Sequence, residues 1–150
     1  MKIAIGNDHA GVALKLEIME MLTEEGYEVI NCGVDTTDSV DYPDIAEQVT
    51  TEVLKQNILG VLICGTGIGI SIAANKIIGI RAALCQNIYT AQMAREHNDA
   101  NIVALGARVT GGALAVEIVR AFVKSDFQAG RHLKRVEKII ALEEKHRDRR

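Results

Sequence analysis

The 150-residue sequence contains no tryptophan, and aromatic residues make up only 3% of it. Base stacking would therefore find few partners, which argues against a nucleic-acid ligand. No apolar run approaches the roughly 20 residues that a membrane-spanning helix needs. The short apolar N-terminus, residues 1–6, leads directly into strand-like sequence rather than into a signal peptide. We therefore expect a cytoplasmic protein that binds neither a membrane nor nucleic acid.

Proline occurs once and cysteine three times. With 48% apolar residues, a chain this poor in proline is not extensively disordered, and its length suits one domain covering residues 1–150. The cysteines form no Cys-x-x-Cys pair, so neither a disulfide framework nor a zinc site is expected. Cys32 and Cys85 end apolar runs and are interpreted as small buried hydrophobic residues.

The formal net charge of −3 conceals a strong asymmetry along the chain. Residues 1–50 carry 2 basic and 11 acidic residues, a net of −9, whereas residues 101–150 carry 11 and 6, a net of +5. Without interleaved aromatic residues, the basic part fits a cluster of arginines for a small phosphorylated ligand better than a nucleic-acid surface. Two subunits could also pair their opposite ends.

Strand-like and helix-like segments alternate throughout the chain, which predicts a doubly wound α/β fold of three layers. The five strands form a parallel sheet, a C-terminal helix follows, and ligands bind beyond the carboxyl ends of the strands. The expected strands cover residues 2–6, 27–31, 58–64, 81–84 and 102–105. The expected helices cover residues 8–25, 43–56, 70–76, 88–97, 112–123 and 133–145, with residues 146–150 as a frayed tail.

The glycine-rich turn after the third strand is the most informative segment. The strand ends at Cys64, and Gly65-Thr66-Gly67-Ile68-Gly69 leads at once into a helix. Backbone N–H groups in such a turn form an anion pocket, and a thiol at its edge loses its proton more readily. No Lys-Ser/Thr pair follows the last glycine, so the turn is not a nucleotide triphosphate loop. The turn has two interpretations: it is either a catalytic site for a small anion or only a tight connection between a strand and a helix.

The remaining candidates also have two readings each. Asp8 either caps a helix or lies with His9 at the mouth of the pocket, and Asp8 replaces a glycine of the dinucleotide-binding fingerprint. His97-Asn98 is typical of a helix C-terminus. The basic residues Arg131, His132 and Arg135 begin the last helix, where cations are disfavoured unless an anion is near.

Six segments of the chain form a characteristic set, and they are Asn7–Gly11, Val40–Asp44, Cys64–Lys76, Gly79–Ala83, His97–Asn101 and Gly130–His132. In this order and spacing they resemble the type B ribose-5-phosphate isomerase family, which also includes the two-chain galactose-6-phosphate isomerases. The resemblance covers residues 1 to about 140 and implies a Rossmann-like fold. It also implies a homodimer, or a pair of dimers, with active sites at the subunit interface and neither metal nor organic cofactor.

The resemblance further implies reversible interconversion of D-ribose 5-phosphate and D-ribulose 5-phosphate through an enediolate. Cys64 would be the base, and Thr66 with the amides of Gly65, Gly67, Ile68 and Gly69 would hold the enediolate oxygen. His97 and Asp8 would assist ring opening, and Tyr42 and Asn98 would contact sugar hydroxyls. The expected phosphate ligands are His9, Arg131 and Arg135, some from the partner chain, with Arg108 a weaker candidate.

Two features qualify the resemblance. Many members carry a small residue where Asn7 stands, so the sequence does not determine the shape of the pocket floor beside Asp8. Some members use a glutamate as the base, and this sequence has no glutamate at that position. The alternatives are an isomerase of a six-carbon sugar phosphate (allose 6-phosphate or galactose 6-phosphate), a ligand-binding module without catalysis, and thiol redox chemistry between Cys64 and Cys85.

Overall fold

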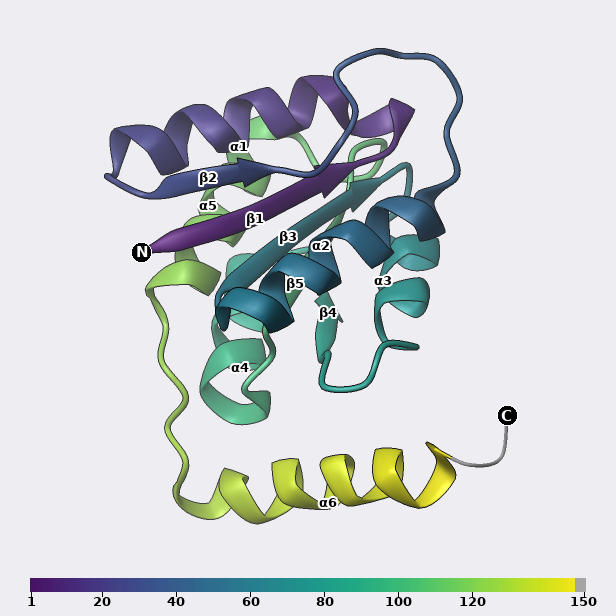
Figure 1. The fold of residues 1–150 in the computed structure, drawn as a ribbon. Helices are drawn as coiled ribbons and strands as arrows, with labels where there is room; N and C mark the ends of the chain where they lie inside the picture. Colours follow the sequence, from purple (N-terminus) through teal and green to yellow (C-terminus); the bar gives the residue numbers. More distant parts are fainter. Residues whose placement is uncertain (148–150) are drawn as a thin grey trace.

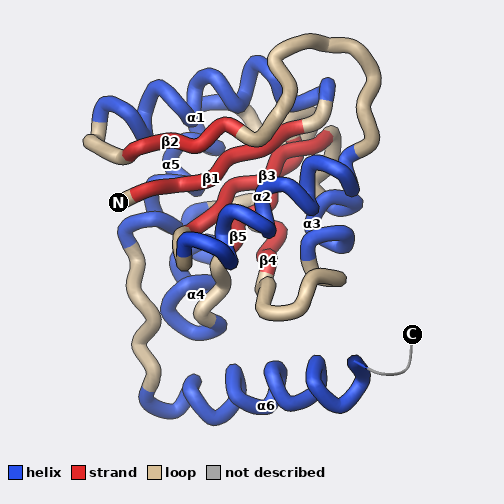
Figure 2. The backbone as a smooth tube through the Cα atoms, in the orientation of Figure 1, coloured by secondary structure: helices blue, strands red, loops and turns tan. Residues whose placement is uncertain are grey.

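The computed structural model describes residues 1–147, which form a parallel β-sheet between two layers of helices (Figures 1 and 2). The strand order is β2-β1-β3-β5-β4, and every neighbouring pair is parallel. The strands are β1 (Lys2–Asn7), β2 (Glu28–Asn31), β3 (Leu59–Cys64), β4 (Ala82–Leu84) and β5 (Ile102–Gly106). The helices are α1 (Val12–Glu24), α2 (Tyr42–Gln56), α3 (Ile68–Ala74), α4 (Ile88–Asn98), α5 (Gly112–Lys124) and α6 (Gly130–His146).

Two apolar cores lie on opposite faces of the sheet. Helices α1, α4 and α5 supply one core, and α2 and α3 supply the other. Side chains of β3 alternate between the two, with Ile63 in the first core and Leu62 and Cys64 in the second. The predicted three-layer α/β fold is thereby confirmed, and the alternation directs the Cys64 side chain toward the face covered by α2 and α3.

The predicted elements are confirmed apart from some of their ends. A short 3-10 turn (His9–Gly11), capped by the Asp8 side chain, precedes α1, where the sequence predicted one continuous helix. Helix α6 begins at Gly130, three residues before the predicted start, directly after Ala129, which has a positive φ of 51°. The helix continues to His146, so the predicted frayed tail is helical at its first residue, and residues 148–150 lie outside the described residues.

Helix α6 lies apart from the sheet, beyond the end of α4, and an irregular segment connects it to α5 (Figure 1). Only His132 and Val136 of α6 are buried. A cavity of about 560 Å³ lies between α6 and the β4 side of the sheet, with Ile78, Asn98 and Ile139 among its lining. The apolar side chains that α6 leaves exposed are Leu133, Ile139, Ile140 and Leu142. Within residues 1–147, none of the helices combines the length and the apolar character needed to cross a membrane.

Candidate functional site

Cys64 ends β3, and its thiol faces the backbone of the glycine-rich turn. The Gly67 N–H donates a hydrogen bond to Cys64 Sγ at 3.2 Å. Cys64 is only 4% exposed, whereas Thr66, two residues further on, is exposed. An N–H aimed at sulfur stabilises negative charge there, so the turn suits a thiol that gives up and takes back a proton.

The conformation of this turn is fixed by its own backbone and by the segment after β5. Gly67 has φ +77°, and the Ile68 N–H donates to Thr66 Oγ1 at 3.3 Å. The Ala107 and Arg108 N–H groups donate to the carbonyls of Cys64 and Gly65 at 2.8 and 2.9 Å. A Cβ on Gly67 would lie 2.6 Å from Leu84 Cδ1, so only glycine fits this left-handed position.

Asp8 and His9 lie at the same edge of the sheet, after β1. The Asp8 N–H donates to the carbonyl of Ile63 at 3.0 Å, and Asp8 Oδ1 accepts from the Ala10 N–H at 2.9 Å. His9 Nδ1 accepts from the Val40 N–H at 3.3 Å, which assigns the proton of the neutral ring to Nε2. Nε2–H is thus the donor that His9 can offer to a ligand.

Tyr42 and Arg108 complete this group. A Cβ on Gly69 would lie 2.7 Å from Cζ of Tyr42, so the phenol ring rests directly on the turn. A Cβ on Gly65 would lie 3.2 Å from Arg108 Nη1, so this guanidinium covers the other side. The first two strands, the turn and the segment after β5 therefore bring together the predicted residues of the pocket: Asp8, His9, Tyr42, Cys64, Gly65, Thr66, Gly67, Ile68, Gly69 and Arg108.

The other predicted site residues lie at the opposite edge of the sheet. Helix α4 runs antiparallel to the strands, so its last residues, His97 and Asn98, precede the start of β5. Cys64 pairs with Gly106 at the far end of β5, and this five-residue strand spans roughly 15 Å. Arg131 and Arg135, in the first half of α6, lie near His97, whose ring stacks on that of His132. One chain therefore does not bring the two groups together.

His132 joins this second group, although the sequence assigned it no role of its own. Burial lowers the pKa of the His132 imidazole, and the charges of His97, Arg131 and Arg135 lower it further. His132 is thus favoured as a neutral ring between cations. Sequence spacing gave a basic segment here but no sign of the stack, because His97 and His132 belong to different helices.

Asn7, whose effect on the pocket floor the sequence left open, is fully buried. Its Nδ2 donates to the carbonyls of Asp8 and Val34 at 2.8 and 3.0 Å. The side chain therefore ties the end of β1 to the loop after β2. These two hydrogen bonds hold the backbone at Asp8 in place, and a residue with a small apolar side chain could not form them.

The other two cysteines, Cys32 and Cys85, do not belong to the turn. Burial raises the pKa of the Cys85 thiol, and Cys85 belongs to the apolar core on the face opposite Cys64. The redox alternative thereby loses its nearby partner thiol. Cys32 is half-buried rather than buried as predicted, and burial raises its pKa as well. Within residues 1–147, no group of three or more His, Cys, Asp or Glu residues could hold a metal ion.

Three well-formed cavities of the described chain do not include Cys64 in their lining. Their volumes are about 560, 760 and 310 Å³. At the edge of the sheet that carries Cys64, backbone amides, Tyr42 and Arg108 surround the thiol. His97, Asn98, Arg131 and Arg135, which were expected to face the same ligand, lie at the opposite edge. In a single chain, the two groups of predicted site residues therefore remain apart.

A thiol set in an amide turn at the carboxyl edge of a parallel sheet is typical of an α/β enzyme site. A family model described as Ribose/Galactose Isomerase matches residues 3–139, and the chain belongs to this family. It is 50% identical over 145 residues to ribose-5-phosphate isomerase B of Escherichia coli, covering 96% of this chain and 97% of that protein. The structure of Clostridium thermocellum ribose-5-phosphate isomerase B is 55% identical, with a TM-score of 0.94 over 97% of this chain and 99% of that one.

A third relative carries a different substrate in its name. It is the D-erythrulose-4-phosphate isomerase of Pectobacterium atrosepticum, 43% identical over 150 residues, with 97% of this chain and 99% of that protein covered. All three likenesses extend over nearly the whole chain, so the chain is an enzyme of the isomerase class.

Proposed function

We propose that the protein interconverts D-ribose 5-phosphate and D-ribulose 5-phosphate. Near-complete likeness to two proteins named ribose-5-phosphate isomerase B supports this substrate. The observation that carries the chemistry is the 3.2 Å hydrogen bond from the Gly67 N–H to Cys64 Sγ. A proton acceptor and an amide donor then lie side by side, as an enediolate reaction requires. A phosphorylated sugar does not cross a bilayer unaided, so we place the reaction in the cytoplasm.

In the proposed reaction the Cys64 thiolate removes the proton from C2 of the open-chain aldose. The electrons move to the carbonyl oxygen at C1, and the resulting enediolate oxygen is held by Thr66 and the amides of Gly65–Gly69. The Cys64 thiol then returns the proton to C1, the proton of the C2 hydroxyl passes to the C1 oxygen, and the C2 carbonyl forms. No electrons leave the substrate, so the reaction needs no external oxidant or reductant.

We further propose that the site is built from two copies of the chain. Cys64 and Asn98 lie at opposite edges of the sheet, and a two-fold axis places the second group of one copy on the first group of the other. Exposed apolar residues on α6 and α3, among them Leu142 and Ile72, offer surface for such a contact. The negative N-terminal and positive C-terminal parts of the chain would then attract each other.

The second group has three tasks in this two-chain site. His97, with Asp8 across the interface, moves the proton that opens the furanose ring, because an imidazole can both donate and accept a proton. Asn98 and Tyr42 bind sugar hydroxyls. Arg131 and Arg135 join His9 on the phosphate, with Arg108 at the rim, and a fixed phosphate orients the reacting carbons.

A coupled assay of ribose 5-phosphate conversion, run after treatment with a chelator, tests the proposed reaction. We expect activity in the wild type, its loss in Cys64→Ala, and full activity in the control Cys32→Ser, since Cys32 is half-buried and lies just after β2, outside the glycine-rich turn. Circular dichroism and phosphate binding should be unchanged in both variants. Turnover retained by Cys64→Ala would disprove the assignment of the base.

The choice of sugar has alternatives that the same assay separates. We expect kcat/KM to be highest for ribose 5-phosphate, compared with allose 6-phosphate, galactose 6-phosphate and erythrulose 4-phosphate. A higher value for a six-carbon or a four-carbon substrate would change the assigned substrate but not the class of reaction. Tight nucleotide binding by calorimetry without turnover of any sugar phosphate would support a binding module instead.

A further inference from the structure

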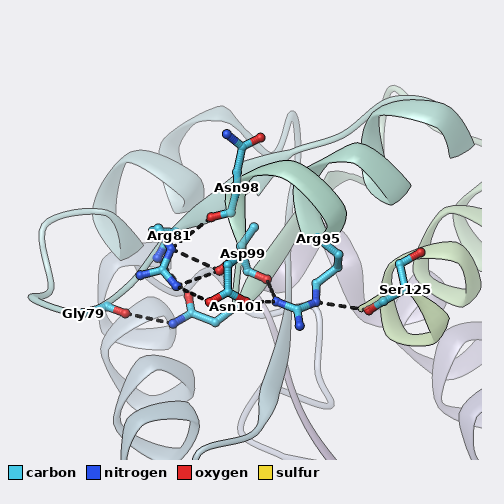
Figure 3. A network of polar contacts seen from close by, with 8 residues as sticks. Gly79, Arg81, Arg95, Asn98, Asp99, Asn101 and Ser125 are labelled. Atoms are coloured by element: carbon cyan, nitrogen blue, oxygen red, sulfur yellow. Dashed lines mark hydrogen bonds and ion pairs between the residues drawn. The ribbon is translucent and has the colours of Figure 1, made fainter. Parts of the chain in front are cut away.

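The turn that ends α4 directly after His97 and Asn98 has an uncommon conformation. Asp99, its C-cap, is left-handed with φ +46°, a conformation that is unfavourable for most residues with a side chain. Its carboxylate accepts from two arginines, with Oδ2 3.1 Å from Arg81 Nη2 and Oδ1 2.8 Å from Arg95 Nη1 (Figure 3). The left-handed residue is therefore held from two sides.

The same guanidinium groups also hold the backbone of the turn. Arg81 Nε donates to the carbonyls of Asn98 and Asp99 at 3.1 and 3.0 Å, and Arg95 Nη1 donates to the carbonyl of Ala100 at 2.7 Å (Figure 3). These carbonyls are the acceptors that a helix C-terminus leaves without intrahelical donors. The side chains of Arg81 and Arg95 are only 20% and 12% exposed, so few other rotamers are accessible to them and the hydrogen bonds are retained.

A second set of bonds ties the segment before α6 to this end of α4. Arg95 Nε donates to the carbonyl of Ser125 at 3.4 Å (Figure 3). The Gln128 N–H donates to the carbonyl of Glu96 at 3.1 Å, and Gln128 Nε2 donates to Glu96 Oε2 at 2.8 Å. The segment is thus fixed just before α6, where the His132 ring meets His97.

Arg81 itself is anchored through its backbone. The Arg81 N–H donates to Asn101 Oδ1 at 2.8 Å, and Asn101 Nδ2 donates to the carbonyl of Gly79 at 2.8 Å. This gives a role to the Gly79–Ala83 segment, one of the six sequence segments, for which the proposed reaction has no task. Its arginine lies at the edge opposite Cys64, where it holds the turn that carries His97.

We propose that Arg81, Asp99 and Arg95 are positioning residues that set the direction in which His97 and Asn98 leave the end of α4. The inference rests on the proposed ring-opening role of His97. None of the three is assigned a substrate contact. They act through His97 and Asn98, because they fix the orientation in which these two side chains enter the Cys64 pocket of the second copy.

Another helix of the chain shows that such a turn does not require arginines. Asn57, the C-cap of α2, is also left-handed, with φ 52°, and its N–H donates to the carbonyl of Val53. In the described part of the chain no arginine is bonded to it. Helix α2 carries no predicted site residue at this end. The two arginines are therefore found at the turn that follows His97 and Asn98 and not at the turn of α2.

The test is a double-mutant cycle. Asp99→Gly keeps the left-handed backbone accessible while removing the carboxylate, and it is combined with His97→Asn, whose residual turnover uses spontaneously opened sugar. If Asp99 acts through His97, Asp99→Gly should lower kcat for ribose 5-phosphate at least about tenfold in the wild type and less than about twofold in His97→Asn. The matched control Asn57→Gly should leave kcat unchanged in both backgrounds.

Equal losses in the two backgrounds would show a general structural defect and overturn the proposal, as would an unchanged kcat in Asp99→Gly. Asp99→Asn, which also tolerates the left-handed conformation, replaces Asp99→Gly if that variant melts early. Absence of ribose 5-phosphate turnover in the wild type would instead refute the proposed substrate. The two failures are therefore distinguishable.

Discussion

The imidazole rings of His97 and His132 stack with their centroids 4.0 Å apart and their planes 12° from parallel. Two positive charges at this distance would repel each other, so the pair favours a state in which one ring is neutral. The lowered pKa of His132 identifies that ring. The stack also joins α6 to α4, and it places Arg131 and Arg135 on the same side of the molecule as His97.

Protonation of His132 should destabilise the protein in mild acid. Because its folded-state pKa lies below the ordinary value of 6.5, the unfolded state binds the proton first as the pH falls. The stability contributed by the neutral ring is therefore complete above about pH 6.5 and is lost as the pH falls toward the folded-state pKa. Urea unfolding at a fixed protein concentration, between about pH 7.5 and about pH 5, should show this loss in the wild type.

His132→Gln should flatten this dependence, whereas His146→Gln, which changes an exposed histidine of the same helix, should not. A wild-type curve that does not fall below about pH 6.5 more steeply than that of His132→Gln would contradict the assignment.

Replacing Gly69 by alanine should act on substrate binding through Tyr42. The added methyl would lie 2.7 Å from Cζ of Tyr42, so the ring must move off the turn. We expect KM for ribose 5-phosphate to rise about three- to tenfold with a smaller change in kcat, because Tyr42 binds the sugar and does not move the proton. Gly111→Ala is the matched control, since its methyl would meet open space. A fall in kcat alone would contradict an effect on binding through Tyr42 and would point instead to displacement of the Gly69 amide that holds the enediolate oxygen.

Lys15 is a buried anchor for the loop that follows β2. Its side chain is fully buried, and Nζ donates to Asp35 Oδ1 at 2.6 Å, to the Val34 carbonyl at 2.7 Å and to Asn31 Oδ1 at 3.2 Å. Hydrogen bonding to Lys15 lowers the pKa of the Asp35 carboxyl. The loop continues to Val40, whose N–H donates to His9.

Lys15→Met should lower the free energy of unfolding by about 1–3 kcal/mol, the cost of leaving buried acceptors without a donor. Lys55→Met, which changes an exposed lysine of α2, should cost much less, and urea unfolding compares the two. Phosphate affinity should also weaken in Lys15→Met, because His9 loses its fixed tautomer. Equal stability of the two variants would show that the loop does not depend on Lys15.

Local sequence patterns predicted most of the fold. The apolar run ending at Cys64, the glycines after it and the proline at the start of α2 each carry information within a few residues. The start of α6 was not predicted because it depends on a positive φ at Ala129, which no local preference indicates. The 3-10 turn at His9 was missed because Asp8 caps a short turn as readily as a long helix.

The site was predictable only in part, for a topological reason. Residues that follow strands gather at one edge whatever the packing, which is why Asp8 and Cys64 could be grouped from sequence. Family resemblance grouped His97 with these residues. In the structure, however, α4 runs antiparallel to the strands, so His97 at its end lies at the opposite edge of the sheet. Contacts between distant segments, such as Arg81 with Asp99 and Lys15 with Asp35, leave no mark in local spacing.

Mixing two variants, one inactive and one with only residual turnover, tests the shared site most directly. Cys64→Ala and His97→Asn are each purified, mixed in equal amounts, dissociated and reassembled, and then assayed with ribose 5-phosphate. If His97 of one copy serves Cys64 of the other, half of the reassembled dimers contain one intact site, and activity should recover to about one quarter of the wild-type value. Recovery no greater than the sum of the separate variants, with mixed dimers confirmed by mass, would contradict a site built from two chains.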